Sequence, residues 1–344
     1  MRQPIHRILV IRWGALGDLV ITSAVFEDLA RAFPQAEIHL NTEPPWDRMF
    51  ADDPRFAKVI AIRIRGERRL PGTWRWLAAM RSGKYDLIID LQSNDRSRLL
   101  LALFVLSGAS VPYRAATRRH FPYNIVPPPI PRHAHALEYF RAPLRALGVP
   151  VATEKPALYV AARHEERAAL LMQAEGLEPG GFAILMPGSN ARGLLKRWGA
   201  ARYAGLARLL HAAGMPRIAL VGGAAEAEEC AAIERHGGGG IVNLCGRTEI
   251  LEIVPLSRQA RFIVANDTGT AHLASATATP MVVICGPTDP RRVKPLGNNV
   301  VAIKADVECC QQKTCSHHAC MAMITPAMVF ARLMELDQAC RQAK

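Results

Sequence analysis

The turn Gly14-Ala15-Leu16-Gly17-Asp18 combines two glycines with a carboxylate directly after a short apolar run. Glycines permit a tight turn and close approach of a ligand, and a helix that begins there presents free backbone N–H groups. Asp18 has the chemistry of a general base, which would take a proton from an attacking hydroxyl. It would equally serve as a helix cap or a partner of the helix dipole, and the residues alone favour that structural role.

A second polar segment, Asn266-Asp267-Thr268-Gly269-Thr270-Ala271-His272, follows another apolar run. Backbone N–H groups at a helix start, with the hydroxyls of Thr268 and Thr270, suit the oxygens of a pyrophosphate. Asp267 would repel phosphate, so we expect it to contact a ribose or sugar hydroxyl, or to orient the turn. A histidine at the position of His272 is more often structural than ligand-binding, and both roles stay open.

Two further turns carry residues suited to a nucleotide. Pro187-Gly188-Ser189-Asn190 is followed by Lys196-Arg197-Trp198, and a hydroxyl-bearing turn with a nearby lysine can neutralise a departing diphosphate. A solvated basic loop explains the same residues equally well. Glu226 follows Gly222-Gly223, where it would either accept from a ribose hydroxyl or favour the start of its helix.

Short apolar strands alternate with helical segments in both halves of the chain, which is typical of parallel sheets covered by helices. In the first half we predict strands at residues 8–11, 37–40, 59–62 and 87–91, with helices over 22–33 and 136–147. In the second half we predict strands at 183–186, 218–221, 262–265 and 281–285, and a last helix over 326–341. The polar turns therefore follow strand ends, where ligands bind in sheets of this kind.

The chain of 344 residues is long enough for two α/β domains. We predict an acceptor-binding domain over 1–165, a nucleotide-binding domain over 166–325, and a final helix over 326–344 that can pack back on the first domain. Two doubly wound halves are found in GT-B glycosyltransferases, two-domain dehydrogenases and periplasmic-type binding proteins, and the pattern alone does not decide among them. A nicotinamide dehydrogenase is disfavoured, because neither half has GxGxxG with an acid about 20 residues later.

The formal net charge of +13 favours anionic partners, although a generally basic composition explains it equally well. The aromatic residues are few and do not alternate with basic ones, so we expect no nucleic-acid partner. The amino terminus lacks a signal-peptide pattern, and the apolar run 99–106 is shorter than the ~20 residues needed to cross a bilayer. We therefore expect a soluble, cytoplasmic protein.

The cysteines fall into two groups. Three stand apart among apolar residues and are predicted to be small buried hydrophobic residues: Cys230, Cys245 and Cys285. Four others lie within a dozen positions: Cys309, Cys310, Cys315 and Cys320. Their spacing lacks the paired CxxC of a typical zinc site, so a reduced structural loop is favoured over a metal site.

The motifs GALGD, PGS with KRW downstream, GG before an acidic helix, NDTGTAH and GPTDP occur in this order. Together they resemble the heptosyltransferases of glycosyltransferase family 9 across nearly the whole chain. The resemblance implies a GT-B fold, with two Rossmann-like, doubly wound domains facing a central cleft. It also implies an inverting, metal-independent enzyme without a cofactor that transfers heptose from ADP-heptose to a lipid A-linked lipopolysaccharide core.

Two alternatives stay open beside this reaction. One is a glycosyltransferase that uses another nucleotide sugar for O-antigen, capsule or protein glycosylation. The other is a non-catalytic, basic homologue that binds carbohydrate or membrane.

The resemblance also implies roles for individual residues. Asp18 matches the proposed general base, and the residues implied for the donor are Ser189, Lys196, Glu226, Asp267, Thr268, Gly269, Thr270 and His272. Arginine guanidinium groups suit phosphate and carboxylate groups. The candidate acceptor residues are therefore Arg63, Arg65, Arg96, Arg98 and Arg114, together with Gly17 beside Asp18. A solvated or membrane-facing surface explains any one of these arginines equally well. The implied partners are a nucleotide sugar, a lipid-linked oligosaccharide and an anionic membrane, contacted peripherally at the inner face of the inner membrane.

Overall fold

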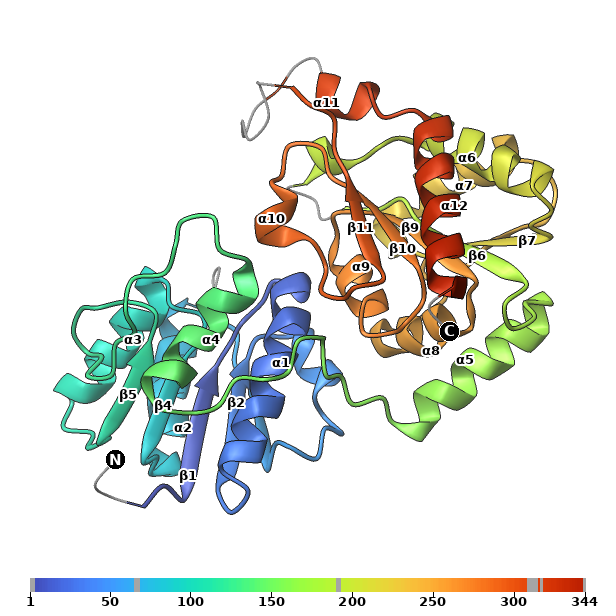
Figure 1. The fold of residues 1–344 in the computed structure, drawn as a ribbon. Coiled ribbons are helices and arrows are strands. Elements are labelled where there is room, and N and C mark those ends of the chain that lie inside the picture. Colours follow the sequence, from blue (N-terminus) through green and yellow to red (C-terminus); the bar gives the residue numbers. More distant parts are fainter. Residues whose placement is uncertain (1–3, 65–68, 190–192, 308–314, 316–317, 343–344) are drawn as a thin grey trace. The chain divides into compact units, whose positions relative to one another are not determined.

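The computed structural model describes residues 4–64, 69–189, 193–307, 315 and 318–342 (Figure 1). The chain divides into two compact units, Met1–Tyr159 and Val160–Lys344. This division falls a few residues before the predicted boundary at residue 165. The reason is that helix α5, Ala162–Glu175, packs against α8, Ile253–Gln259, and so belongs to the second unit.

The first unit is built on a five-stranded parallel sheet with the order β3-β2-β1-β4-β5. Its strands are β1 (Arg7–Ile11), β2 (Glu37–Thr42), β3 (Lys58–Ala61), β4 (Leu87–Asp90) and β5 (Tyr113–Ala116). Its helices are α1 (Leu16–Ala32), α2 (Arg69–Gly83), α3 (Asp95–Leu106), α4 (Ala136–Ala146) and the 3-10 helix η1 (Trp46–Met49). Helix α1 packs with α4, and α2 packs with α3.

The central strand β1 shows why this layered arrangement forms. Its residues Ile8 to Ile11 are all fully buried, as expected for a strand covered on both faces. Leu9 and Ile11 share a hydrophobic cluster with Trp76 of α2 and Phe104 of α3. The α2–α3 pair therefore covers the face of the sheet to which Leu9 and Ile11 point.

The second unit is built on a six-stranded parallel sheet with the order β11-β10-β9-β6-β7-β8. Its strands are β6 (Phe182–Met186), β7 (Arg217–Leu220), β8 (Ile241–Asn243), β9 (Phe262–Asn266), β10 (Met281–Ile284) and β11 (Val300–Ile303). Besides α5 and α8, its helices are α6 (Ala200–Ala212), α7 (Ala227–His236), α9 (Gly269–Ala274), α10 (Pro290–Val293), α11 (Ala319–Ala322) and α12 (Pro326–Gln342). Short 3-10 helices are η3 (Leu194–Lys196), η4 (Ala224–Glu226) and η5 (Ile250–Glu252).

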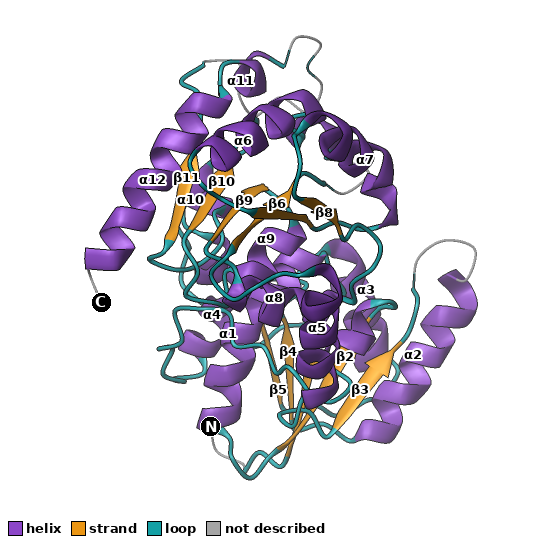
Figure 2. Cartoon of the chain, turned by 90° about the vertical axis from the view of Figure 1, so that its right-hand side faces the viewer, coloured by secondary structure: helices purple, strands orange, loops and turns teal. Residues whose placement is uncertain are grey.

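The last helix, α12, packs against α6 and β10 (Figure 2). The sequence left open whether this helix packs back on the first domain, but its buried residues Val329 and Leu333 lie in the core of the second unit. Trp198 is buried in the same core, and its indole N–H donates to the carbonyl of Ile324 at 2.7 Å. The segment before α12 thus anchors the loop that leads into α6.

The central strands were predicted close to their observed bounds, whereas β5, β8 and β11 were not predicted. All three are edge strands. β5 and β8 are short, only partly buried and contain a polar residue each, so they lack the continuous apolar run of a central strand. β11, Val300–Ile303, is short and partly buried but entirely apolar, and was missed although its sequence has such a run. Helix α1 begins at Leu16 instead of the predicted Thr22, which places Asp18 in its first turn. Among the described helices, none combines the length and apolar character needed to span a membrane.

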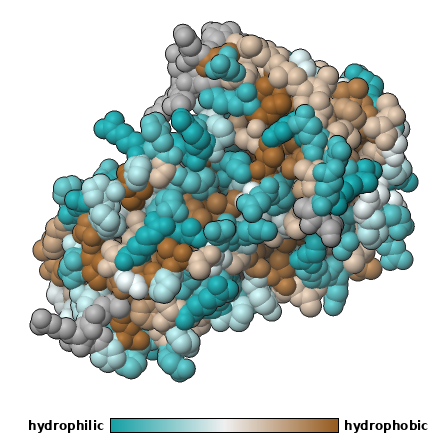
Figure 3. Space-filling view, viewed as in Figure 1, coloured by the Kyte–Doolittle hydropathy of each residue, from teal (hydrophilic) through white to brown (hydrophobic). Residues whose placement is uncertain are grey.

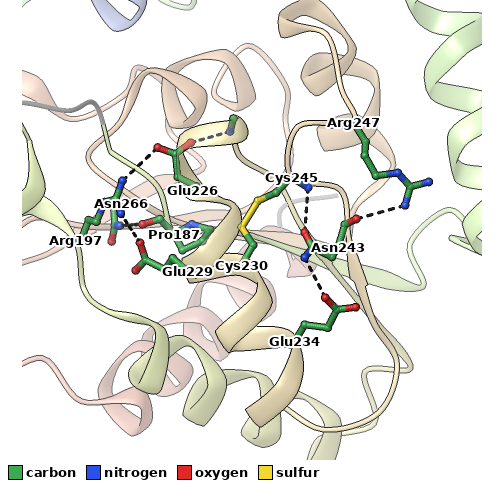
Figure 4. The surroundings of a disulfide bond; sticks show 11 residues. Pro187, Arg197, Glu226, Glu229, Cys230, Glu234, Asn243, Cys245, Arg247 and Asn266 are labelled. Atoms are coloured by element: carbon green, nitrogen blue, oxygen red, sulfur yellow. Dashed lines mark hydrogen bonds and ion pairs between the residues drawn. A yellow bond between two sulfur atoms is a disulfide. The ribbon is translucent and has the colours of Figure 1, made fainter.

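The prediction that Cys230 and Cys245 are separate buried hydrophobic residues is wrong, because they form a disulfide (Figure 4). Cys230 lies on α7 and Cys245 follows β8, and α7 packs against β8, so the two meet in space. Cys285 is buried, as predicted, and burial raises the pKa of its thiol to about 12. Cys320 is buried and Cys315 is half-buried, while Cys309 and Cys310 lie outside the described residues.

Candidate functional site

Three polar turns of the second unit lie at one edge of its sheet. Ser189 follows β6, Gly222-Gly223 follows β7, and Asp267 follows β9. The strands β9, β6 and β7 are neighbours and run parallel, so their carboxyl ends meet at the same edge. This edge is where a doubly wound sheet binds its ligand.

Asn266 holds two of these turns together. Its side-chain N–H group donates to the carbonyl oxygens of Pro187 and Gly188, and its side-chain oxygen accepts from the Tyr203 hydroxyl at 3.1 Å. Asn266 is completely buried, so these bonds have no competition from water. Gly188 also lies against Glu226, because a Cβ at Gly188 would stand 2.6 Å from the Glu226 Cγ.

Lys196 and Asp267 form an ion pair at this edge. The Lys196 Nζ lies 2.7 Å from the Asp267 Oδ2, and the Lys196 side chain is 28% exposed whereas that of Asp267 is 5% exposed. Asp267 was expected to contact a sugar hydroxyl or to orient the turn. In this structure it provides the counter-charge of Lys196, whose exposed side remains accessible to an anionic ligand.

Arg197 links the remaining side chains of the edge. Its Nε donates to the Ser189 hydroxyl at 3.2 Å, and its other nitrogens lie 3.4 Å from Glu226 and 3.2 Å from Glu229 (Figure 4). Burial raises the pKa of Glu229, and the charge of Arg197 opposes that rise. The sequence pointed to Arg197 only as a neighbour of Lys196 in the KRW motif.

Of the two roles predicted for Glu226, the structure shows the structural one, which is to favour the start of its helix. Its Oε2 accepts from the Gly223 backbone N–H at 2.8 Å, which satisfies a donor that would otherwise be free at the start of η4. Contact with a ribose stays a prediction.

The remaining predicted donor residues lie at the start of α9. Thr268 takes the N-cap position without a capping bond from its own hydroxyl, and Gly269 is the first helical residue. Thr270 is half-buried and His272 is buried. Together with Lys196, this helix start provides positive charge and N–H donors beside the Ser189 turn.

Asp18 occupies the first turn of α1 in the first unit. The N-cap of α1 is Ala15, so the predicted capping role of Asp18 is wrong, whereas its place in the first turn agrees with the predicted partnership with the helix dipole. Its Oδ2 lies 2.5 Å from an Arg12 nitrogen, and its side chain is 46% exposed. Gly17 precedes it in the same turn. An exposed carboxylate held by a cation can accept a proton from a bound hydroxyl.

Arg12 is the residue at this site that the sequence analysis missed. It follows β1 and is buried, its NH1 group donates to the Leu91 carbonyl at 2.7 Å, and its guanidinium lies 4.5 Å from the centre of the Phe140 ring. Burial lowers the pKa of Arg12, and the charges of Asp18 and Asp90 oppose this. The sequence could have indicated Arg12 as a site residue, because it is a charged residue directly after an apolar strand.

The candidate acceptor arginines do not form a single cluster. Arg63 follows β3 and Arg114 lies on β5, and these strands are the opposite edges of the first sheet. Arg114 donates to the carbonyls of Pro122 and Val111, so its guanidinium anchors the proline-rich loop. Arg96 is exposed and Arg98 is half-buried, both on α3, while Arg65 lies outside the described residues.

Comparison with known proteins identifies the family. Residues 73–321 match glycosyltransferase family 9 (heptosyltransferase). Lipooligosaccharide heptosyltransferase 2 of Haemophilus ducreyi is 28% identical over 320 residues, covering 87% of this chain and 88% of that protein.

Two solved structures show the same fold. E. coli ADP-heptose lps heptosyltransferase II superposes with a TM-score of 0.78 at 23% identity, covering 97% of this chain and 99% of the other. The glycosyl transferase family 9 structure from Veillonella parvula has a TM-score of 0.85 at 18% identity, with 98% and 99% covered. The predicted GT-B fold is thereby confirmed, and the chain belongs to glycosyltransferase family 9, the heptosyltransferases.

Proposed function

We propose that this glycosyltransferase moves a heptose from ADP-heptose to a lipid-linked lipopolysaccharide core. The observation that carries the proposal is the partly exposed Lys196, paired with Asp267 at the carboxyl edge of the second sheet, in a chain of this family. Relatives named lipooligosaccharide or ADP-heptose lps heptosyltransferase support this donor and this acceptor.

The donor would lie along the carboxyl edge of the second sheet. As the bond between the sugar and ADP breaks, the diphosphate gains negative charge, and Lys196 with the N–H groups of α9 would stabilise it. Thr268, Gly269 and Thr270 belong to that helix start, and Ser189 stands opposite it in the proposed site. Glu226 would accept a hydrogen bond from a ribose hydroxyl. The buried His272, which belongs to α9, would help to hold that helix in place. Because these groups supply the positive charge, we propose that transfer needs no metal ion.

Asp18 would act as the general base. In the proposed single displacement, an acceptor hydroxyl attacks the anomeric carbon, its proton passes to the Asp18 carboxylate, and ADP leaves from the opposite face. The configuration at that carbon is therefore inverted. Gly17 and the exposed arginines Arg63 and Arg96 would contact the acidic acceptor. With a lipid-linked acceptor, the enzyme would work on the cytoplasmic side of the inner membrane.

Nucleotide binding is the first test of this proposal. Calorimetry with ADP, UDP, GDP and NAD, in magnesium-free buffer containing chelator, should show selective binding of ADP. Preference for UDP or GDP would keep the reaction class and change the donor. Binding of none of these nucleotides by the folded protein would contradict the proposed donor site.

Arg12 should matter to transfer because it fixes the Asp18 carboxylate. Replacing Arg12 by methionine should lower kcat about 10²-fold, since a small displacement of a catalytic group has an effect of that size. ADP affinity should not change, because the proposed donor residues all belong to the second unit. The measurements are turnover, ADP calorimetry and thermal unfolding.

Arg48→Met controls for the loss of a positive charge, because Arg48 is an exposed arginine of the same unit, and thermal unfolding reports any effect of removing the buried Arg12. Arg12→Lys should recover part of the lost turnover by restoring a cation near Asp18. Unchanged turnover in Arg12→Met would show that Asp18 needs no such partner.

A further inference from the structure

Helix α3 exposes a row of leucines. Leu99, Leu103 and Leu106 are 54%, 42% and 73% exposed. Their spacing places them on one face of the helix, opposite the buried Leu101 and Phe104. Large aliphatic side chains in a contiguous exposed row are unfavourable in water and mark a surface that meets another apolar phase.

Helix α2, which packs with α3, exposes an aromatic residue. Trp74 is 72% exposed, while Trp13, Trp76 and Trp198 are fully buried. Arg81 lies two turns after Trp74 on the same side of α2, and it donates to the carbonyl and hydroxyl of Ser107, just after Leu106, at 2.7 and 2.8 Å. Trp74 lies on the side of α2 opposite the buried Trp76, just as the leucines lie on the side of α3 opposite the buried Phe104, and Trp76 packs against Phe104. Trp74 and the leucines therefore both point away from the core that the two helices share.

Basic residues surround these apolar side chains. Arg96 and Arg98 lie on the two flanks of the leucine row, and Arg75 and Lys84 are exposed on and after α2. The sequence of α2 contains no acidic residue, and that of α3 contains only Asp95, which pairs with Arg118 at 2.5 Å. We call the following set the α2–α3 face: Trp74, Arg75, Arg81, Lys84, Arg96, Arg98, Leu99, Leu103 and Leu106.

A groove of about 490 Å³ opens at the carboxyl ends of the two helices. Its lining includes Arg81, Lys84 and Phe104, a combination of cations with an apolar floor. Asp86 also lines it, but its carboxylate accepts from the backbone N–H groups of His6 and Arg7. The groove therefore suits a small anionic group such as a phosphate.

We propose that the α2–α3 face docks on a bilayer that contains anionic phospholipids. Trp74 and the leucines would enter the boundary between headgroups and acyl chains, where tryptophan is favoured, and the basic residues would contact lipid phosphates. Figure 3 shows another face of the first unit, on which apolar (brown) and polar (teal) residues are also interspersed. Docking would bring the enzyme to its lipid-linked acceptor. This purpose rests on the proposed function, whereas binding of the α2–α3 face to lipid does not.

The position of Trp74 allows a direct test. Vesicles of phosphatidylcholine with phosphatidylglycerol should shift the protein's tryptophan emission to shorter wavelength, and brominated acyl chains should quench it. Trp74→Phe should abolish both signals while the protein still sediments with the vesicles. Phosphatidylcholine alone should bind at least tenfold more weakly, and salt should weaken binding to the anionic vesicles. A wild-type protein that shows no quenching overturns the proposal.

Surface variants distinguish binding through the α2–α3 face from non-specific binding of the protein to vesicles. Leu99→Ser with Leu103→Ser should weaken vesicle binding at least tenfold. Arg75→Glu with Lys84→Glu should do the same, because each basic residue near an anionic surface contributes about fivefold. The matched controls lie in the second unit, where Leu170 is 65% exposed and Arg235 is exposed. If Leu170→Ser and Arg235→Glu weaken binding as much, the α2–α3 face is not the docking surface.

ADP calorimetry and transfer to a delipidated, soluble acceptor separate this proposal from the proposed function. Both should be unchanged in Leu99→Ser/Leu103→Ser, so that only vesicle binding is lost. If the wild type transfers heptose but binds no vesicles, the docking proposal fails and the function stands. A dimer that the leucine variant dissociates, without vesicle binding, would assign the face to a second copy of the chain and overturn the lipid partner.

Discussion

Replacing Asp18 by asparagine should lower the kcat of heptosyl transfer about 10³-fold, within the range that a general base contributes. Asparagine keeps the size of the side chain but cannot take the proton of the acceptor hydroxyl. ADP affinity should stay within about twofold, because the proposed donor residues lie on the other unit. Steady-state turnover and ADP calorimetry on the same preparation measure the two effects.

Asp95 offers a matched control for Asp18. It also stands in the first turn of a helix and pairs with an arginine at 2.5 Å. Asp95→Asn should therefore reproduce any general effect of removing such a charge and leave kcat unchanged. If Asp18→Asn retains full turnover, Asp18 only neutralises Arg12, and the base must be sought elsewhere.

Replacing Lys196 by alanine should have the largest effect on the donor side. Loss of one charged donor to a departing group typically lowers kcat by about 10²–10³-fold. ADP affinity should fall as well, because the buried Asp267 would lose its counter-charge and repel the diphosphate. Turnover with ADP-heptose and calorimetry with ADP measure the two losses.

A double variant separates the two causes of weaker ADP binding. Lys196→Ala with Asp267→Asn should recover part of the ADP affinity, since the uncompensated carboxylate is gone, but not the turnover. Lys155→Ala, which removes an exposed lysine, is the control. If Lys196→Ala binds ADP as tightly as the wild type, Lys196 is not part of the donor site.

The fold could be predicted from the sequence where burial imposes a pattern. Strands such as β1 and β6 are covered on both faces, so their sequences are continuously apolar and were recognised. The edge strands β5 and β8 have less to bury and contain polar residues, so their sequences resemble those of loops, whereas the apolar run of β11 was overlooked. Helix α1 was predicted to begin too late, because Gly17 and Asp18 of its first turn were assigned to the turn before it.

The candidate site was predictable in its turns and not in its pairings. Glycines, hydroxyls and acids after apolar strands marked the carboxyl edges of the sheets. The partners of those residues depend on tertiary structure, however. Arg12 reaches Asp18 across a turn, Asn266 bonds to the turn after a different strand, and Cys230 meets Cys245 only because α7 packs on β8. Spacing along the chain contains no record of these contacts.

The bond from Trp198 to Ile324 has a consequence for how the enzyme matures during synthesis. Lys196 and Arg197 precede Trp198 directly, and Trp198 is fixed by a carbonyl near the carboxyl terminus and by the core to which α12 contributes. Chains fold from the amino terminus as they emerge from the ribosome. The first unit can therefore form early, whereas the Lys196 loop gains its anchor only after almost the entire chain has been made. A nascent chain cut short before Ile324 would retain every proposed donor residue and still lack the support that orients them.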